Sequence, residues 1–172
     1  MAAQKGPPIY TLTPTAARKV LDDAQSGPVK KPAVHIEDKI LPCGPDQKVS
    51  VRIFRPKGSA KTLPVILFYH GGGWILGNKH THERLVSELA VGVDAAVVFV
   101  NYTPSPEAHF PKPVEEAYGH KLSRAGVPVT AVRFLGTVHD FVMLNALSET
   151  PAVRGAIALA IDYLKKALYS QA

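Results

Sequence analysis

Apolar and polar residues follow different periods along this 172-residue chain, and the periods predict its strands and helices. Residues 33–42 and 47–56 alternate with period two on either side of the turn sequence CGPD, which predicts an antiparallel pair of strands. Residues 63–69 and 95–102 are continuous apolar runs rich in Val and Ile, with a helical pattern at residues 83–92 between them. This arrangement is typical of buried parallel strands joined by a crossover helix.

Further segments carry apolar residues at helical spacing. Residues 15–24 follow Thr13, a favourable N-cap residue, and a proline in the first turn. Residues 113–126 and 151–168 predict two more helices, and residues 127–136 predict a strand between them. After the N-terminal helix the order is strand, strand, strand, helix, strand, helix, strand, helix. This order predicts an α/β fold with a mostly parallel sheet, an N-terminal antiparallel strand pair and flanking helices.

Composition favours one globular domain, because 46% of the residues are hydrophobic and 20% are charged. The chain has 20 Lys and Arg against 14 Asp and Glu, a formal net charge of +6. These basic residues are scattered and no aromatic residues are interleaved with them, so we expect a solvated basic surface and no nucleic-acid partner.

Cys43 is the only cysteine, which excludes an internal disulfide. The first residues contain no apolar signal-like segment, and the longest apolar run, residues 95–100, is too short to cross a bilayer. We therefore expect a cytoplasmic location and no membrane span. Four histidines lack partners at metal-ligand spacing and are expected to be solvated or capping residues: His80, His82, His109 and His120.

Three consecutive glycines, Gly71, Gly72 and Gly73, follow the apolar run at residues 63–69 in the sequence HGGGW. Acyl transfer places negative charge on a carbonyl oxygen, and backbone N–H groups stabilise that charge where glycine lets the chain approach closely. A phosphate-binding loop is the alternative interpretation, but neither GxGxxG nor a GK[ST] ending is present.

HGGGW after ILFY, followed by GNKHTH, resembles the oxyanion-loop signature of the hormone-sensitive-lipase-like carboxylesterases, within the α/β-hydrolases. The resemblance implies that Gly72 and Gly73 donate the N–H groups of an oxyanion hole. It also implies that His70, Gly71 and Trp74 support the loop. The substrates implied are small acyl esters, with no metal and no organic cofactor.

Two later segments resemble the same family, so that the resemblance runs from about residue 11 to residue 168. Residues 97–111, VVFVNYTPSPEAHFP, resemble a strand and loop that usually read VNYRLAPEHPFP. Residues 125–145, AGVPVTAVRFLGTVHDFVMLN, resemble the segment that delivers the catalytic histidine, which implies His139 for that role.

The nucleophile and the acid of that family are not recognisable in this chain. None of its eight serines has glycine two residues before and two residues after it, so there is no GxSxG elbow. No segment between Tyr118 and His139 resembles the family's acid-bearing DPLRDE. Asp140 follows His139 directly, and we expect that it could hardly fold back to bond the imidazole.

The gap has a definite position, because PVEEAYGHKLSRAGVPV combines the beginning of one family helix with the end of another. We infer an internal deletion at Glu116–Tyr118 that removed the elbow and the acid. The chain is then a single domain, 1–172, with an N-terminal half at 1–118 that carries the oxyanion loop and a C-terminal part at 119–172. The lost strands would leave an exposed sheet edge, which predicts self-association.

The sequence leaves several functions open. The first is a carboxylic ester hydrolase that is inactive or very weak, with Gly72 and Gly73 as oxyanion hole and His139 as base. The second is an active esterase that uses a substitute nucleophile, for which Ser105 is the candidate. The third is a non-catalytic module that binds an acyl ligand or a partner. Fluorophosphonate labelling separates the second function from the others.

Overall fold

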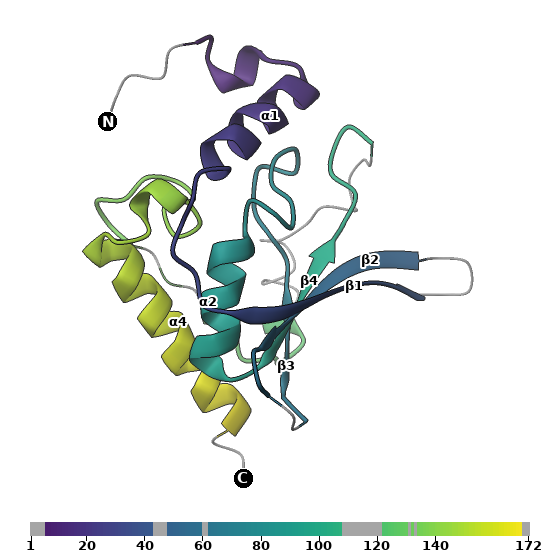
Figure 1. Cartoon of the computed structure of the whole chain (residues 1–172), viewed down its shortest axis with the longest axis vertical. Coiled ribbons are helices and arrows are strands. Elements are labelled where there is room, and N and C mark those ends of the chain that lie inside the picture. The colour runs from purple at the N-terminus through teal and green to yellow at the C-terminus, as the bar shows by residue number, and fades with distance from the viewer. Residues whose placement is uncertain are drawn as a thin grey trace.

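The structure is a computed structural model that describes residues 6–42, 48–59, 62–107, 122–130, 132 and 134–169. Its centre is a four-stranded sheet of order β1-β2-β4-β3, with helices packed beside it (Figure 1). The strands are β1 (Val34–Pro42), β2 (Lys48–Pro56), β3 (Val65–Phe68) and β4 (Ala96–Asn101). The helices are η1 (Ile9–Thr11), α1 (Pro14–Gln25), α2 (Glu83–Val93), η2 (Asn145–Leu147) and α4 (Pro151–Tyr169).

The strand pairings follow the two sequence periods. β1 and β2 form the predicted antiparallel pair, with Val34 opposite Pro56. β3 and β4, the two continuous apolar runs, are parallel and are joined through α2 as predicted. β2 also pairs with β4, in antiparallel orientation. The prediction of a mostly parallel sheet is wrong for the described strands: the sheet is mixed, with two antiparallel pairings and one parallel pairing. The predicted α/β class, with an N-terminal antiparallel pair and flanking helices, is confirmed.

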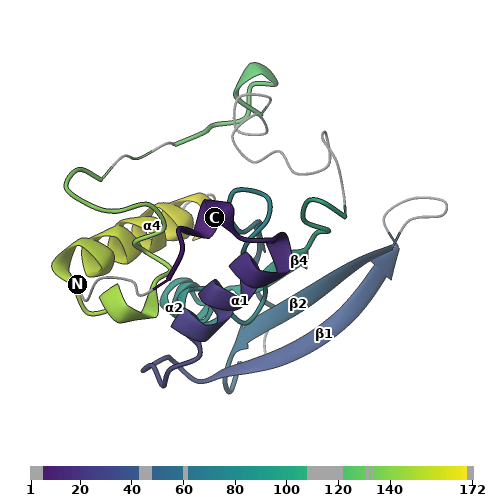
Figure 2. The ribbon, with the colours of Figure 1, turned by 90° about the horizontal axis from the view of Figure 1, so that it is seen from above.

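One face of the sheet packs against α2, and α4 lies beside α2 (Figure 1). Figure 2 shows the β1–β2 ribbon along one side of these helices. The buried core joins Phe54, Val97 and Phe99 of the sheet to apolar residues of both helices. The two helices approach closely at Gly92, where a Cβ would lie 2.3 Å from Ile161 Cδ1. A side chain at position 92 would therefore push α4 away from the core.

Local sequence explains where the helices begin and end. Thr13 caps α1 as predicted, since its hydroxyl oxygen accepts the N–H of Ala16 at 3.3 Å. α2 ends at Asp94, whose φ of 61° gives the left-handed conformation common after a helix. Thr150 precedes the proline that begins α4, and its carbonyl oxygen accepts the N–H of Arg154 at 3.0 Å.

The strand predicted at residues 127–136 is wrong, because none of its described residues belongs to a strand. Val127, Val129 and Leu135 are exposed instead. An alternating apolar segment becomes a strand only where a neighbouring strand offers hydrogen bonds, and local pattern does not determine that neighbour. Of the helix predicted at residues 113–126, residues 122–124 are helical and residues 113–121 lie outside the described residues, as does the proposed junction.

β3 lies at the edge of the sheet, next to β4 alone among the described strands. Val65 and Leu67, on the face turned away from α2, are 56% and 60% exposed. This edge is therefore both apolar and accessible. Within the described part of the chain, no helix is both long enough and apolar enough to cross a membrane.

Candidate active site

The loop at residues 70–77 follows β3 and contains the three glycines. Gly72 and Gly73 have φ of 125° and 58°, and Trp74 has φ of 63°. The N–H groups of Ile75 and Leu76 donate to the carbonyl oxygen of Gly72 at 3.2 and 2.8 Å. Positive φ is easy for glycine and strained for tryptophan, and such strain clusters at functional loops.

The N–H groups of Gly72 and Gly73 donate to no acceptor among the described residues. Gly72 is buried, and a buried N–H without an acceptor is rare because it costs as much as a lost hydrogen bond. A Cβ at Gly72 would lie 2.2 Å from the carbonyl oxygen of Leu76, so the loop requires glycine there. Among the described residues, these two adjacent N–H groups therefore have no acceptor.

His70 begins this loop and is held between two aromatic rings. Its ring stacks on Phe99 at 5.1 Å and on Tyr102 at 4.4 Å between centroids. Its Nδ1 lies 2.7 Å from the carbonyl oxygen of Gly71, and the Tyr102 hydroxyl donates to the His70 carbonyl oxygen at 2.5 Å. Burial lowers the pKa of His70, opposed by the Gly71 hydrogen bond and by the negative charge of Asp140. His70 is therefore a neutral ring that fixes the loop.

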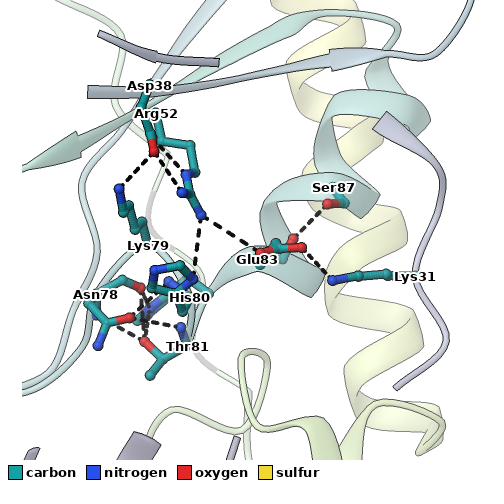
Figure 3. Close-up of polar contacts among 10 residues, drawn as sticks. Lys31, Asp38, Arg52, Asn78, Lys79, His80, Thr81, Glu83 and Ser87 are labelled. Atoms are coloured by element: carbon teal, nitrogen blue, oxygen red, sulfur yellow. Dashed lines mark hydrogen bonds and ion pairs between the residues drawn. The ribbon is translucent and has the colours of Figure 1, made fainter. Parts of the chain in front are cut away.

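The segment after the loop is fixed by a polar turn (Figure 3). The side-chain oxygen of Asn78 accepts the N–H groups of His80 and Thr81 at 2.8 and 3.1 Å. His80 is exposed, as expected. The sequence predicts a solvated or capping His82, and it is the N-cap residue of α2, without a side-chain cap hydrogen bond. It is not solvated, since it is 4% exposed with its ring centroid 5.2 Å from that of His70. Burial, with the nearby His70, lowers the pKa of His82 to about 4.

A cluster of charged residues joins this turn to the sheet (Figure 3). Asp38 of β1 accepts hydrogen bonds from Arg52 at 2.7 and 2.8 Å and from Lys79 at 2.8 Å. These hydrogen bonds hold the pKa of the Asp38 carboxyl well below its usual range. Arg52 also lies 3.8 Å from Glu83, which pairs with Lys31. The first turn of α2 is thereby tied to β1 and β2.

Arg18 of α1 holds the glycine loop from another side. Its Nε donates to the carbonyl oxygen of Ile75 at 2.9 Å, and its Nη2 donates to that of Ser105 at 2.7 Å. Both Nη atoms bond Glu107, and this contact lowers the pKa of Glu107 to about 2. The N–H of Ser105 donates to the carbonyl oxygen of Trp74 at 2.7 Å. Ser105, the candidate substitute nucleophile, thus lies beside the glycine loop.

His139 lies on an exposed turn, and its side chain is 87% exposed. His139 Nδ1 lies 3.3 Å from Asp140 Oδ2, within ion-pair distance, but no hydrogen bond joins these two side chains, in line with the expectation that Asp140 could hardly fold back to bond the imidazole. Asp140 has a positive φ of 59°.

Other residues singled out from the sequence lie apart from this region or outside the described residues. Cys43, His109, His120 and Glu116–Tyr118 belong to the residues that the structure does not describe. Where the chain is described, no group of three or more His, Cys, Asp or Glu is placed to hold a metal ion.

Comparison with known sequences finds relatives of this chain among the α/β hydrolases. Residues 66–120 match a family model of the α/β hydrolase fold. A putative α/β hydrolase of Acanthamoeba polyphaga mimivirus is 40% identical over 111 residues, which is 64% of this chain and 31% of that protein. Carboxylesterase NlhH of Mycobacterium tuberculosis is 33% identical over 102 residues, 59% of this chain and 32% of that protein. The chain thus spans about a third of the length of the curated relatives it matches.

Comparison with solved structures gives the same result. A double mutant of the esterase rPPE superposes with a TM-score of 0.83 at 25% identity, over 95% of this chain and 92% of that chain. An ester hydrolase from the metagenome of Lake Arreo superposes with a TM-score of 0.57 at 28% identity, over 88% of this chain and 50% of that chain.

Proposed function

Because this chain is a hormone-sensitive-lipase-like member of the α/β-hydrolases, we propose that it binds small carboxylic esters at the glycine loop and hydrolyses them slowly. The observation that carries the proposal is the pair of N–H groups at Gly72 and Gly73 that donate to no described acceptor. Both N–H groups are suited to stabilise an ester carbonyl oxygen, because that oxygen gains negative charge when the ester carbon is attacked. His70 and Trp74 shape the loop around them.

In the proposed reaction, His139 acts as a general base toward water. Its imidazole removes a proton while the water oxygen bonds the ester carbon, and the carbonyl electrons move to the oxygen held by Gly72 and Gly73. Collapse of this intermediate breaks the bond to the alcohol oxygen, which takes the proton from the imidazolium. The products are a carboxylic acid and an alcohol, and His139 is neutral again.

The rate should be low because no serine of this chain lies in a GxSxG elbow. Serine hydrolases that lose a member of their triad keep only about 10³-fold catalysis over water, from the oxyanion hole and substrate binding. The exposure of His139 lowers the expected rate further, because bulk water competes for the hydrogen bonds of a side chain that is 87% exposed. Asp140 is the one described carboxylate in contact with that ring.

The test combines turnover of a short-chain nitrophenyl ester with intact-mass measurement after a fluorophosphonate that labels activated serines. We expect slow turnover, no stoichiometric adduct, and loss of turnover in His139→Ala. A His35→Ala variant serves as the matched control, since His35 is also exposed. A stoichiometric adduct that disappears in Ser105→Ala would replace this proposal by the substitute-nucleophile mechanism. Turnover in His139→Ala equal to that of the wild type would show that His139 is not the base.

A non-catalytic module that binds an acyl ligand or a partner is the second candidate. The apolar, accessible edge at Val65 and Leu67 favours it, because a fatty acyl chain or a protein surface could cover these side chains. Binding of a medium-chain fatty acid that raises the melting temperature, with no ester turnover above buffer, would support this function over hydrolysis.

The internal deletion at Glu116–Tyr118 and a single domain over residues 1–172 remain proposals. They rest on the overlap of two family helix sequences in PVEEAYGHKLSRAGVPV. Sequencing of the gene and its transcripts would show whether a block is missing between 1–118 and 119–172, and one cooperative unfolding transition would support a single domain. Fractionation of expressing cells would test the predicted cytoplasmic location.

A further inference from the structure

Two buried polar side chains, Gln25 and Arg84, hold the segment that follows His139. We propose that they are positioning residues, which place the histidine turn against the glycine loop in a chain whose histidine is not placed by a strand. The expected effect on catalysis rests on the proposed function. The positioning of the histidine segment can be measured without any ester turnover.

Gln25, the last residue of α1, is 8% exposed. Its Nε2 donates to the carbonyl oxygens of Thr81 and Met143 at 2.8 and 2.9 Å. Its Oε1 accepts the backbone N–H of Asn145 at 3.0 Å, and its carbonyl oxygen accepts from Asn145 Nδ2 at 3.1 Å. One amide therefore joins the turn after the glycine loop, at Thr81, to the segment after the histidine.

Arg84 of α2 is 2% exposed and makes a second connection to the same segment. Its Nη2 donates to the carbonyl oxygen of Val142 at 2.6 Å, and its Nε donates to Asn145 Oδ1 at 3.0 Å. The remaining nitrogen bonds Glu88 at 2.9 Å, which compensates the buried charge. A guanidinium is suited to this arrangement because its donors have fixed directions.

These contacts fix the chain immediately after His139, whereas the described residues before it are held by fewer contacts, such as the ring contact of Phe134 with Phe141. The described residues of 127–136 form no strand and are mostly exposed. The part of the chain that delivers the histidine is thus anchored from its C-terminal side, at residues 142–145. The anchor reaches α1 and α2, and α2 begins just after the glycine loop and its polar turn. Both parts of the proposed site then share one support.

The matched control is Arg154, which also bonds Glu88, at 2.5 Å, but has no contact with residues 142–145 among the described ones. Arg154→Met removes one arginine from Glu88 and leaves the anchor in place. Gln25→Ala and Arg84→Met each remove part of the anchor. Asn145→Ala weakens it from the other side, and Arg84→Lys retains the charge without the forked donors.

The experiment is amide hydrogen exchange on the full-length chain, read residue by residue by NMR. We expect Gln25→Ala, Arg84→Met and Asn145→Ala to speed exchange at residues 140–147 by about tenfold or more, relative to α4 and β4. Arg154→Met should leave residues 140–147 unchanged, and Arg84→Lys should lie between wild type and Arg84→Met. If a variant at position 25 or 84 does not fold, Asn145→Ala carries the test alone.

Exchange at residues 140–147 that is unchanged in the folded anchor variants would overturn the proposal, as would an equal effect of Arg154→Met. A wild-type chain without ester turnover would refute the proposed function and leave this measurement intact. Where turnover is present, Asn145→Ala should lower kcat while KM changes little, because it loosens the histidine segment and leaves the Gln25 hydrogen bond to Thr81, beside the glycine loop, in place. A rise in KM alone would count against a positioning role.

Discussion

At the residue scale, Gly72 and Gly73 differ in whether the glycine loop has space for a side chain. A Cβ at Gly72 would lie 2.2 Å from the carbonyl oxygen of Leu76, whereas one at Gly73 would meet nothing within 4 Å. Gly73→Ala should therefore cost only the strain of left-handed backbone, about 1 kcal/mol, and Gly72→Ala should cost about 2–4 kcal/mol because the loop must rearrange. Urea unfolding measures both, and equal costs would contradict the loop geometry.

The buried His82 makes stability depend on pH. Burial lowers its pKa from 6.5 to about 4 in the folded chain. Between these values the unfolded chain binds a proton that the folded chain does not bind, so stability falls as the pH drops from 7 toward 4. The loss reaches at most about 3 kcal/mol.

Urea denaturation at pH 7 and pH 4.5 provides the measurement. His82→Gln should flatten the pH dependence, although it costs stability at neutral pH because the buried ring packs against Phe68 and Phe99. His80→Gln is the control, since His80 is exposed. A pH dependence that survives intact in His82→Gln would assign the effect to other groups.

At the element scale, α1 is attached to two loops through Arg18. Arg18→Met removes donors from Ile75 and Ser105 and from the Glu107 carboxylate. We expect a loss of about 1–2 kcal/mol, because hydrogen bonds of a partly exposed charged group contribute less than buried ones. We also expect faster amide exchange at the glycine loop.

The neighbouring residue provides the control for this prediction. Lys19 pairs with Asp23 on the same helix, and both side chains are largely exposed. Lys19→Met should change the unfolding free energy by less than about 0.5 kcal/mol. If the two variants had equal effects, Arg18 would act through helix charge and not through its contacts with the loops.

The elements that sequence could predict are those determined by local pattern. α1 begins at a capping threonine and a proline, and the sequences of β1 and β2 alternate and pair in antiparallel orientation. Residues 127–136 have an equally clear pattern and form no strand where they are described, because a strand needs an edge and the sequence does not specify one. Pattern also gave no sign that Asp140 adopts positive φ.

Polar side chains that act at a distance were the harder part of the site to predict. The glycines could be singled out because their chemistry is contained in five consecutive residues, HGGGW. Gln25 and Arg84 are separated from Asn145 by 120 and 61 positions, and their contacts exist only after α1, α2 and residues 142–145 are assembled. The sequence does contain one indication of Arg84: it is a charged residue directly before Leu85 and Val86 on a largely apolar helix.

At the scale of the whole molecule, the accessible edge of the sheet predicts self-association. β3 is a short edge strand with Val65 and Leu67 exposed, and an unprotected edge offers both backbone hydrogen bonds and apolar area to a second copy. We expect the purified chain to form dimers or larger species in light scattering, with the apparent mass rising with concentration. Leu67→Lys should shift the population toward monomer, because a charge on an edge strand opposes pairing.

The control for this prediction is a lysine substitution on a helix, away from the sheet edge. Tyr163 on α4 is 48% exposed, close to the 60% of Leu67, but it belongs to a helix and offers no unpaired strand backbone. Tyr163→Lys should leave the apparent mass unchanged if the sheet edge is responsible. If both lysines gave monomer, the added positive charge would be the cause, since the chain already carries a net charge of +6. A wild-type chain that stays monomeric at high concentration, with one cooperative thermal transition, would show that the edge is protected in solution.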